Sequence, residues 1–258
     1  MRRRRVATVL LLLALPLGAA ACGGGKKSST NAASAPMDAV TAAAKKTAEA
    51  GSMKMGLTAA TVGGTNVAVA GAGGFDTSKH EGQLHLHFRT SGISSTMDVV
   101  LSDNKVYLSS PLFSLLLPTG KTWIELDLSK GATAGGIDLS SLLAQDPTDA
   151  LDALQSVSTV TEVGTVQLNG ASATHYKATV EKTTSGSTTA GGTYDVWVGD
   201  DGYIHRVRTT VAASSGSKSG AVAATSNLSG FGEPVTVTVP PASQTVVSTN
   251  GSIPGLGG

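Results

Sequence analysis

Alternation of apolar and polar side chains with a period of two runs through most of the chain after residue 58, and it constrains the fold more than any other feature. Leu84, Leu86 and Phe88 alternate with polar residues over 83–89. Residues 123–128 repeat the pattern. Such alternation predicts strands that bury one face and expose the other. The chain is therefore expected to build a sheet with a single apolar face.

Turn residues separate these segments and indicate how the strands are connected. Asn169-Gly170 and Asp200-Asp201-Gly202 tolerate the positive φ that tight hairpin turns require, and Asp103-Asn104 is expected to turn as well. Hairpins make neighbouring strands antiparallel. The predicted strands are 58–70, 79–90, 97–101, 106–108, 123–128, 160–168, 173–182, 193–198, 203–212, 221–228 and 235–239.

Helical signals are few. Residues 36–50 predict a helix that begins at Pro36, a favoured first-turn residue, and ends at Gly51. Shorter apolar helices are predicted at 111–117 and 138–143, the latter continuing over 147–157. Together these elements predict an α+β fold, in which one large, curved antiparallel sheet has its apolar face covered by helices.

The amino-terminal residues have the layout of a lipoprotein signal peptide at 1–21. Arg2 to Arg5 are followed by an apolar stretch too short to span a membrane, and small residues lead to Cys22. Cys22 is the only cysteine and is the expected site of lipidation. Residues 22–35 read as a flexible tether, 36–242 as the folded domain and 243–258 as a flexible tail. The expected location is the outer face of the cell membrane, held there by the lipid anchor.

Charge excludes some classes of partner. Removing Arg2, Arg3, Arg4 and Arg5 from 19 basic residues leaves 15 against 18 acidic ones, a net charge of −3. This balance argues against nucleic acid as a partner. With Cys22 lipidated, no thiol remains for a disulfide, so a hydrophobic core must hold the domain together.

Candidate chemistry is confined to one histidine cluster. His80, Glu81, His85 and His87 lie close in sequence, and two imidazoles on one strand face could share a zinc ion. The favoured interpretation is a solvated strand face opposite the leucines, and neither a metal nor a cofactor is predicted. His175 and His205 are interpreted as surface residues. No nucleophile, base and orienting residue form a recognisable catalytic set, so the protein is predicted not to be an enzyme.

Three segments carry a family resemblance: KTWIELDL at 121–128, YDVWVGDDGYIHRV at 194–207 and FGEPVTVTVPP at 231–241. They resemble the LppX/LprA/LprF/LprG family of actinobacterial lipoproteins, which is similar in fold to the carriers LolA and LolB. The resemblance covers most of residues 36–242. It implies a half-barrel whose concave face and helices enclose an apolar cavity for acylated lipids. Alanine and glycine where bulky wall residues would stand put the size of that cavity in question.

The expected function is binding or carriage of lipid-like apolar molecules at the cell envelope, without catalysis. The alternative is a structural, interaction or sensory lipoprotein whose half-barrel is filled by its own side chains, with unidentified envelope proteins as partners. The residues expected to line a cavity all lie on the more apolar side of a strand or on a covering helix. They are Leu84, Leu86, Phe88, Val99, Leu101, Leu116, Ile124, Leu126, Leu128 and Leu143.

Overall fold

The computed structural model describes residues 31–62, 67–90, 92–113, 116–130, 133–134, 137–138, 159–185, 188–215 and 218–248. In chain order its elements are α1 (Asn31–Ala48), β1 (Ser52–Val62), β2 (Val67–Asp76), β3 (Glu81–Thr90), β4 (Ile93–Ser102), β5 (Lys105–Ser109), the 3₁₀ turn η1 (Pro111–Phe113), β6 (Trp123–Asp127), η2 (Leu128–Lys130), β7 (Thr133–Ala134), β8 (Ile137–Asp138), β9 (Thr159–Leu168), β10 (Ala171–Ser185), β11 (Thr188–Gly199), β12 (Ile204–Ser215), β13 (Lys218–Ser229), η3 (Ala242–Gln244) and β14 (Thr245–Val247). Within these residues, no helix has both the length and the apolar character needed to cross a bilayer.

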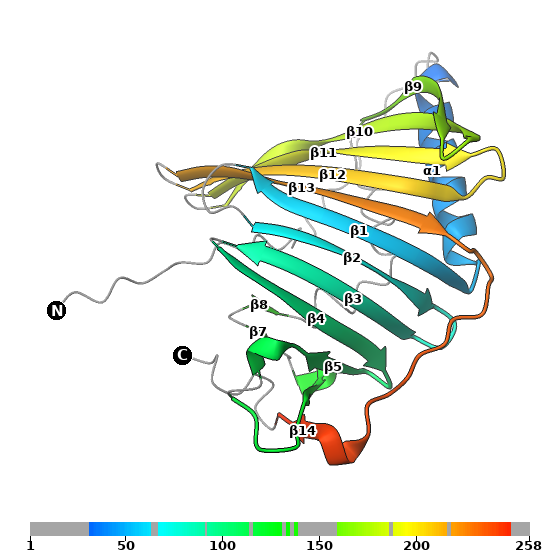
Figure 1. Ribbon diagram of the computed structural model, residues 1–258. Helices are drawn as coiled ribbons and strands as arrows, with labels where there is room; N and C mark the ends of the chain where they lie inside the picture. Colours follow the sequence, from blue (N-terminus) through cyan, green and yellow to red (C-terminus); the bar gives the residue numbers. More distant parts are fainter. Residues whose placement is uncertain are drawn as a thin grey trace.

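Twelve strands form one open sheet in the order β14-β6-β5-β4-β3-β2-β1-β13-β12-β11-β10-β9. All neighbours pair antiparallel except β14 and β6, which run parallel. Figure 1 shows β9 and β14 at the two free edges of a curved sheet, with α1 beside the β9 end. The predicted class, a curved antiparallel half-barrel with helical cover, is confirmed.

The tight turns form where the sequence predicts them. Asp103 and Asn104 have φ of 52° and 60° between β4 and β5, and Asn169 and Gly170 have φ of 53° and 86° between β9 and β10. Two successive positive φ angles define the turn whose twist matches that of the strands it joins. These residues therefore fix the register of two hairpins.

Two glycines allow β2 to approach β3 very closely. A Cβ atom on Gly71 would lie 2.3 Å from the carbonyl oxygen of His85, and one on Gly73 would lie 1.9 Å from that of Gln83. No side chain fits at such distances, so only glycine permits this approach. The glycines that put the cavity wall in question thus let the two strands come together.

Helix α1 packs one stripe of small and branched side chains against the sheet. Val40, Ala43, Ala44 and Thr47 are buried at the helical spacing of three and four. The helix starts at Asn31, five residues before the predicted start, so Pro36 lies inside it. The preceding segment is rich in alanine, which has the highest helix propensity, and this explains the extension. Part of the predicted tether is therefore helical.

Three predicted strand boundaries were wrong. Residues 58–70 are not one strand, since they hold the end of β1 and the start of β2, which pair antiparallel. Residues 235–239 form no ladder, and the flanking Pro234 and Pro240 cannot donate a backbone hydrogen bond. The predicted tail at 243–258 contributes β14, which pairs parallel with β6.

The two short helices predicted from the sequence were also wrong, one in its extent and the other at its start. Of the residues within 111–117 that the structure describes, only Pro111–Phe113 is helical, as a single 3₁₀ turn. Asp138, the predicted start of the next helix, lies instead in strand β8, which pairs with β7. The remainder of that helix, with its continuation over 147–157, lies outside the described residues.

Candidate functional site

The inner face of the sheet, defined as the face on which α1 packs, is the candidate functional site. On β1 to β4 its side chains stand in transverse rows set by the strand register. The first row lies at the end of the sheet where β1 connects to β2 and β3 connects to β4. From there inward, the rows are Val67, Thr90 and Ile93; Ala59, Val69, Phe88 and Ser95; Leu57, Gly71, Leu86 and Met97; and Met55, Gly73, Leu84 and Val99. Successive rows are two residues apart on each strand, because side chains alternate between the two faces of a sheet.

The fully buried residues of these rows all lie in the innermost one. Ile93 in the outermost row is exposed. The next two rows hold half-buried residues, among them Phe88, Leu86 and Met97, while Leu84 and Val99 in the innermost row are buried. We call the half-buried residues Leu57, Val69, Leu86, Phe88 and Met97 the inner strip. It is apolar surface that is only partly covered.

Two closed cores flank the inner strip. One joins α1 to β9–β13 and contains Val40, Tyr176, Tyr194, Val196 and Ile204 among its members. The other lies on β3–β6, and its buried members are Leu84, Val99, Val106, Leu108, Phe113, Ile124, Leu126 and Leu128. Met55 packs against both cores, so the strip and the two cores form one continuous apolar face.

The structure places most of the predicted cavity residues on this face. Leu84, Val99, Ile124, Leu126 and Leu128 are buried members of the second core, and Leu86 and Leu101 pack against it. Phe88 shares their face by register. The structure therefore brings these residues together on one face, but the five buried ones are packed against one another in the second core.

Two predicted covering residues do not close over the sheet as expected. Leu116 is 40% exposed, whereas its neighbour Leu117 packs against the second core. Phe113, which was not predicted, is the buried residue of this segment, because the chain makes a 3₁₀ turn rather than a helix. The uniform apolar run at 112–117 could not indicate which side chain turns inward. Leu143 lies outside the described residues.

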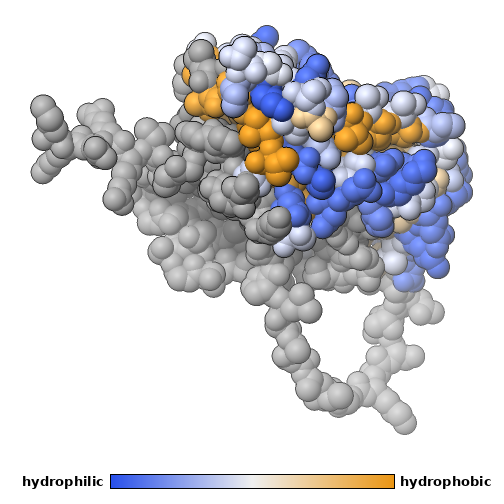
Figure 2. Space-filling model, turned by 90° about the horizontal axis from the view of Figure 1, so that it is seen from below, coloured by the Kyte–Doolittle hydropathy of each residue, from blue (hydrophilic) through white to orange (hydrophobic). Residues whose placement is uncertain are grey.

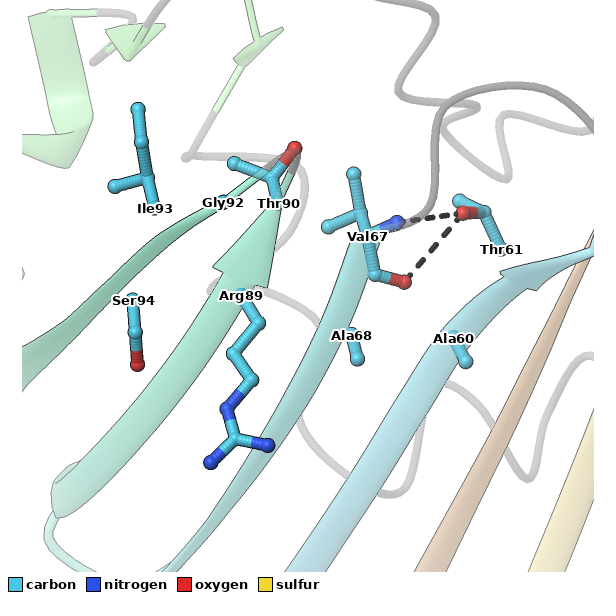
Figure 3. Close-up of a pocket in the computed structure, with 9 residues that line it drawn as sticks. All are labelled: Ala60, Thr61, Val67, Ala68, Arg89, Thr90, Gly92, Ile93 and Ser94. Atoms are coloured by element: carbon cyan, nitrogen blue, oxygen red, sulfur yellow. Dashed lines mark hydrogen bonds between the residues drawn. The ribbon is translucent and has the colours of Figure 1, made fainter.

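A hollow of about 600 Å³ lies at the ends of β1 to β4, beyond the inner strip. Residues from both faces of the sheet line it, and those on the outer face are Ala60, Ala68, Arg89 and Ser94. Figure 3 shows its lining from four adjacent strands, with Val67, Thr90 and Ile93 from the outermost inner row. Arg89 extends from the opposite face of β3, next to Ala68. This rim combines an apolar wall with one cationic side chain.

A second hollow, of about 770 Å³, lies between the start of α1 and the edge of the sheet. The helix contributes Ala35, Pro36 and Ala39, and the sheet contributes residues 159–162 and Tyr176. Burial raises the pKa of Tyr176, and the nearby Glu162 raises it further, so the phenol is neutral at ordinary pH. The wall of this hollow is mostly apolar, with few polar groups, as ligand sites tend to be.

The predicted histidine cluster spreads over the outer face. His85 Nδ1 lies 2.5 Å from Asp98 Oδ1, and the rings of His85 and His87 meet edge to face at 4.9 Å. His80 sits in the turn before β3, with a positive φ. Within the described part of the chain, no three histidine, cysteine or acidic side chains group as metal ligands would.

His175 and His205 are not the plain surface residues that the sequence suggested. His175 stacks on Trp197 at 4.5 Å between ring centroids, and its Nε2 lies 2.9 Å from Asp195 Oδ1. His205 contacts Asp201 across the turn before β12. The His175 contacts join residues of neighbouring strands β10 and β11, so their sequence separation hid them, whereas Asp201 is only four residues from His205.

On the end of the molecule that carries β14, hydrophilic surface surrounds shorter hydrophobic stretches (Figure 2). Exposed apolar side chains in the segments next to β6 and β14 are Leu112, Leu116, Val239 and Val247. Neither of the two hollows described above is lined by these residues. The inner strip, whose apolar residues are contiguous across β1 to β4, is therefore the better candidate site.

No protein-family model and no curated protein matches this chain. Among solved structures, it is similar to LprF from Mycobacterium bovis, at 14% identity and a TM-score of 0.44, over 80% of this chain and 96% of that one. It is likewise similar to the lipoprotein LppX from Mycobacterium tuberculosis, at 14% identity and 0.43, over 78% and 99%. An outer membrane lipoprotein-sorting domain from Vibrio parahaemolyticus matches at 9% identity and 0.29, over 75% and 90%.

Proposed function

We propose that this protein is a lipid-anchored lipoprotein of the cell envelope that binds or carries an acylated, lipid-like molecule on its inner strip, without catalysis. The observation that supports it best is the burial gradient of the inner face. Leu57, Val69, Leu86, Phe88 and Met97 present contiguous apolar surface that the described elements leave half covered. An acyl chain laid along these rows would complete the burial.

Such burial is energetically sufficient to hold a lipid. Each CH₂ group transferred from water to an apolar site contributes about 0.8 kcal/mol. A chain lifted from a bilayer loses the same contribution there, so a carrier must offer an equivalent apolar surface. The inner strip, continuous with two closed cores through Met55, provides one without any polar interruption except Ser95.

A structural or interaction lipoprotein is the second candidate, and one observation favours it. Ile124 and Leu126, both expected to line a cavity, are 0% exposed and are packed within the second core. That part of the half-barrel is filled by its own side chains. The lipid carrier and the structural lipoprotein therefore make different predictions only for the inner strip, which binds a ligand in the first case and not in the second.

The anchor is part of the proposal, because carriage requires the domain to stay near the bilayer. Cys22 lies outside the described residues, and its role rests on the signal-peptide pattern. Cys22→Ser should release the protein from the membrane fraction and abolish its labelling by radioactive palmitate. Retained labelling would contradict the anchor.

A tryptophan pair tests the proposed binding surface. Leu86→Trp fills the inner strip, whereas His87→Trp places the same ring on the outer face of the same strand. We expect wild type and His87→Trp to bind a fluorescent acyl probe and Leu86→Trp to lose that binding while staying folded. Absence of binding by the wild-type chain would favour the structural lipoprotein instead.

A further inference from the structure

The edge strand β9 has an unusual surface for a free edge. Only Glu162 among its ten residues is charged, and its other residues are mainly threonine and valine. Val163 is 57% exposed and Val166 is 39% exposed. Charged side chains are one means by which soluble sheets protect a free edge, and with only one of them this edge presents apolar side chains that are accessible to a partner.

A bulge makes β9 a poor template for another strand. Gly164 pairs with His175 and Glu162 pairs with Tyr176, so Val163 has no partner residue on β10. Gly164 has a φ of 139°. Bulges of this kind bend an edge and interrupt its hydrogen-bonding pattern, which disfavours pairing with a second copy of the chain. The partner should therefore be a surface that contacts side chains rather than a strand.

The position of the anchor identifies that surface. Eight residues lie between Cys22 and Asn31, the start of α1, and such a segment spans at most about 30 Å even when fully extended. The start of α1 lies next to β9 (Figure 1), and the two elements share the hollow lined by Ala35, Pro36 and Val160. The opposite edge, β14, is eleven strand spacings away, about 50 Å along the sheet. A lipid on Cys22 thus holds the β9 edge nearest to the bilayer.

We propose that the β9 edge is the membrane-contacting surface of the protein, with Val163 and Val166 at the lipid–water interface. This contact requires only the lipid anchor and not the proposed binding of a lipid on the inner strip. The free N–H and C=O groups of β9 need water or headgroup partners, so the contact is at headgroup depth and not in the hydrocarbon.

Two exposed valines at opposite edges of the sheet provide a matched test. Val163→Cys and Val247→Cys are made in the full-length chain, where 57% and 60% exposure, respectively, make both changes mild. Lipidation consumes the only native thiol, so each introduced cysteine can be labelled selectively with an environment-sensitive fluorophore. The lipidated proteins are reconstituted in phosphatidylcholine vesicles containing phosphatidylglycerol and a nitroxide-headgroup lipid. Val166→Cys serves as a second position on the same edge.

The label at residues 163 and 166 should shift its emission to the blue and be quenched severalfold by the nitroxide lipid, while the label at 247 should behave as in water. Labels on both edges that remain in water would overturn the proposal, as would quenching at 247 alone. Binding of the acyl probe is measured separately on the same proteins. Quenching at 163 without probe binding would retain the membrane contact and contradict only the proposed lipid binding.

Discussion

The second core and the inner strip are made of the same kinds of side chain and share strands β3 and β4, yet only the core is closed. Leu84 and Leu86 are two residues apart on β3 and point to the same face, but Leu84 is buried and Leu86 is half covered. The difference comes from what lies above them, since Phe113 and Leu126 complete the core around Leu84. Alternation along a strand therefore defines a face, and covering elements from elsewhere in the chain decide whether that face becomes core or binding surface.

Alanine substitutions should separate the two regions most strongly. Leu126→Ala leaves a cavity at a 0% exposed position and should lower the free energy of unfolding by about 2–5 kcal/mol. Leu86→Ala removes the same atoms from a half-buried position, so its cost should be below about 2 kcal/mol. Guanidinium unfolding of both variants measures this difference. Equal losses would mean that the strip is as tightly packed as the core.

A buried hydroxyl tests the other closed core, under α1. Thr47 Oγ1 accepts a hydrogen bond from the Ile204 N–H at 2.9 Å and donates one to the Ala43 carbonyl at 2.8 Å. Thr47→Val keeps the shape but leaves that N–H without its acceptor, which should cost about 1–3 kcal/mol of unfolding free energy. Thr58→Val on the exposed outer face is the matched control, expected to change little. A neutral Thr47→Val would show that the helix is not held by this contact.

The smallest effect on stability is expected at Asp76, where β2 ends before the turn to β3. Hydrogen bonds from Ser78 and Lys79 lower the pKa of Asp76 to about 2 from 3.8. Because the folded-state pKa is lowered, this stabilisation is complete above pH 3.8 and is lost as the pH falls toward about 2. Asp76→Asn should flatten the dependence of the unfolding midpoint on pH within that window. Ser78→Ala should flatten it in part, and an unchanged slope in both variants would exclude this contribution.

Local patterns in the sequence predicted much of the fold because hairpins depend on local information. The alternation around Leu84 and the turn residues Asp103-Asn104 and Asn169-Gly170 correctly predicted faces, turns and antiparallel order. Strand β14 could not be predicted in this way. Its three residues show no extended alternation, and its parallel pairing with β6 joins segments that are more than a hundred residues apart.

The candidate site was predicted less completely, for a related reason. Its apolar face was identified residue by residue, but Leu126 was expected beside a cavity and is instead fully enclosed. Leu116 was expected to cover the sheet and is 40% exposed, whereas Phe113 in the 3₁₀ turn before it is buried. Degree of burial depends on contacts between distant segments, such as Phe113 with the strands of the second core. Periodicity alone carries no information about those contacts.

Native mass spectrometry of the full-length protein, extracted from membranes in mild detergent, tests most directly whether the inner strip holds a lipid. The account predicts a species heavier than the lipidated chain by the mass of one acyl-bearing molecule. That species should disappear in Leu86→Trp and persist in His87→Trp. Wild-type protein that carries only its own covalent lipid, in preparations that retain the fold, would contradict the carrier and leave a half-barrel that serves as structure alone.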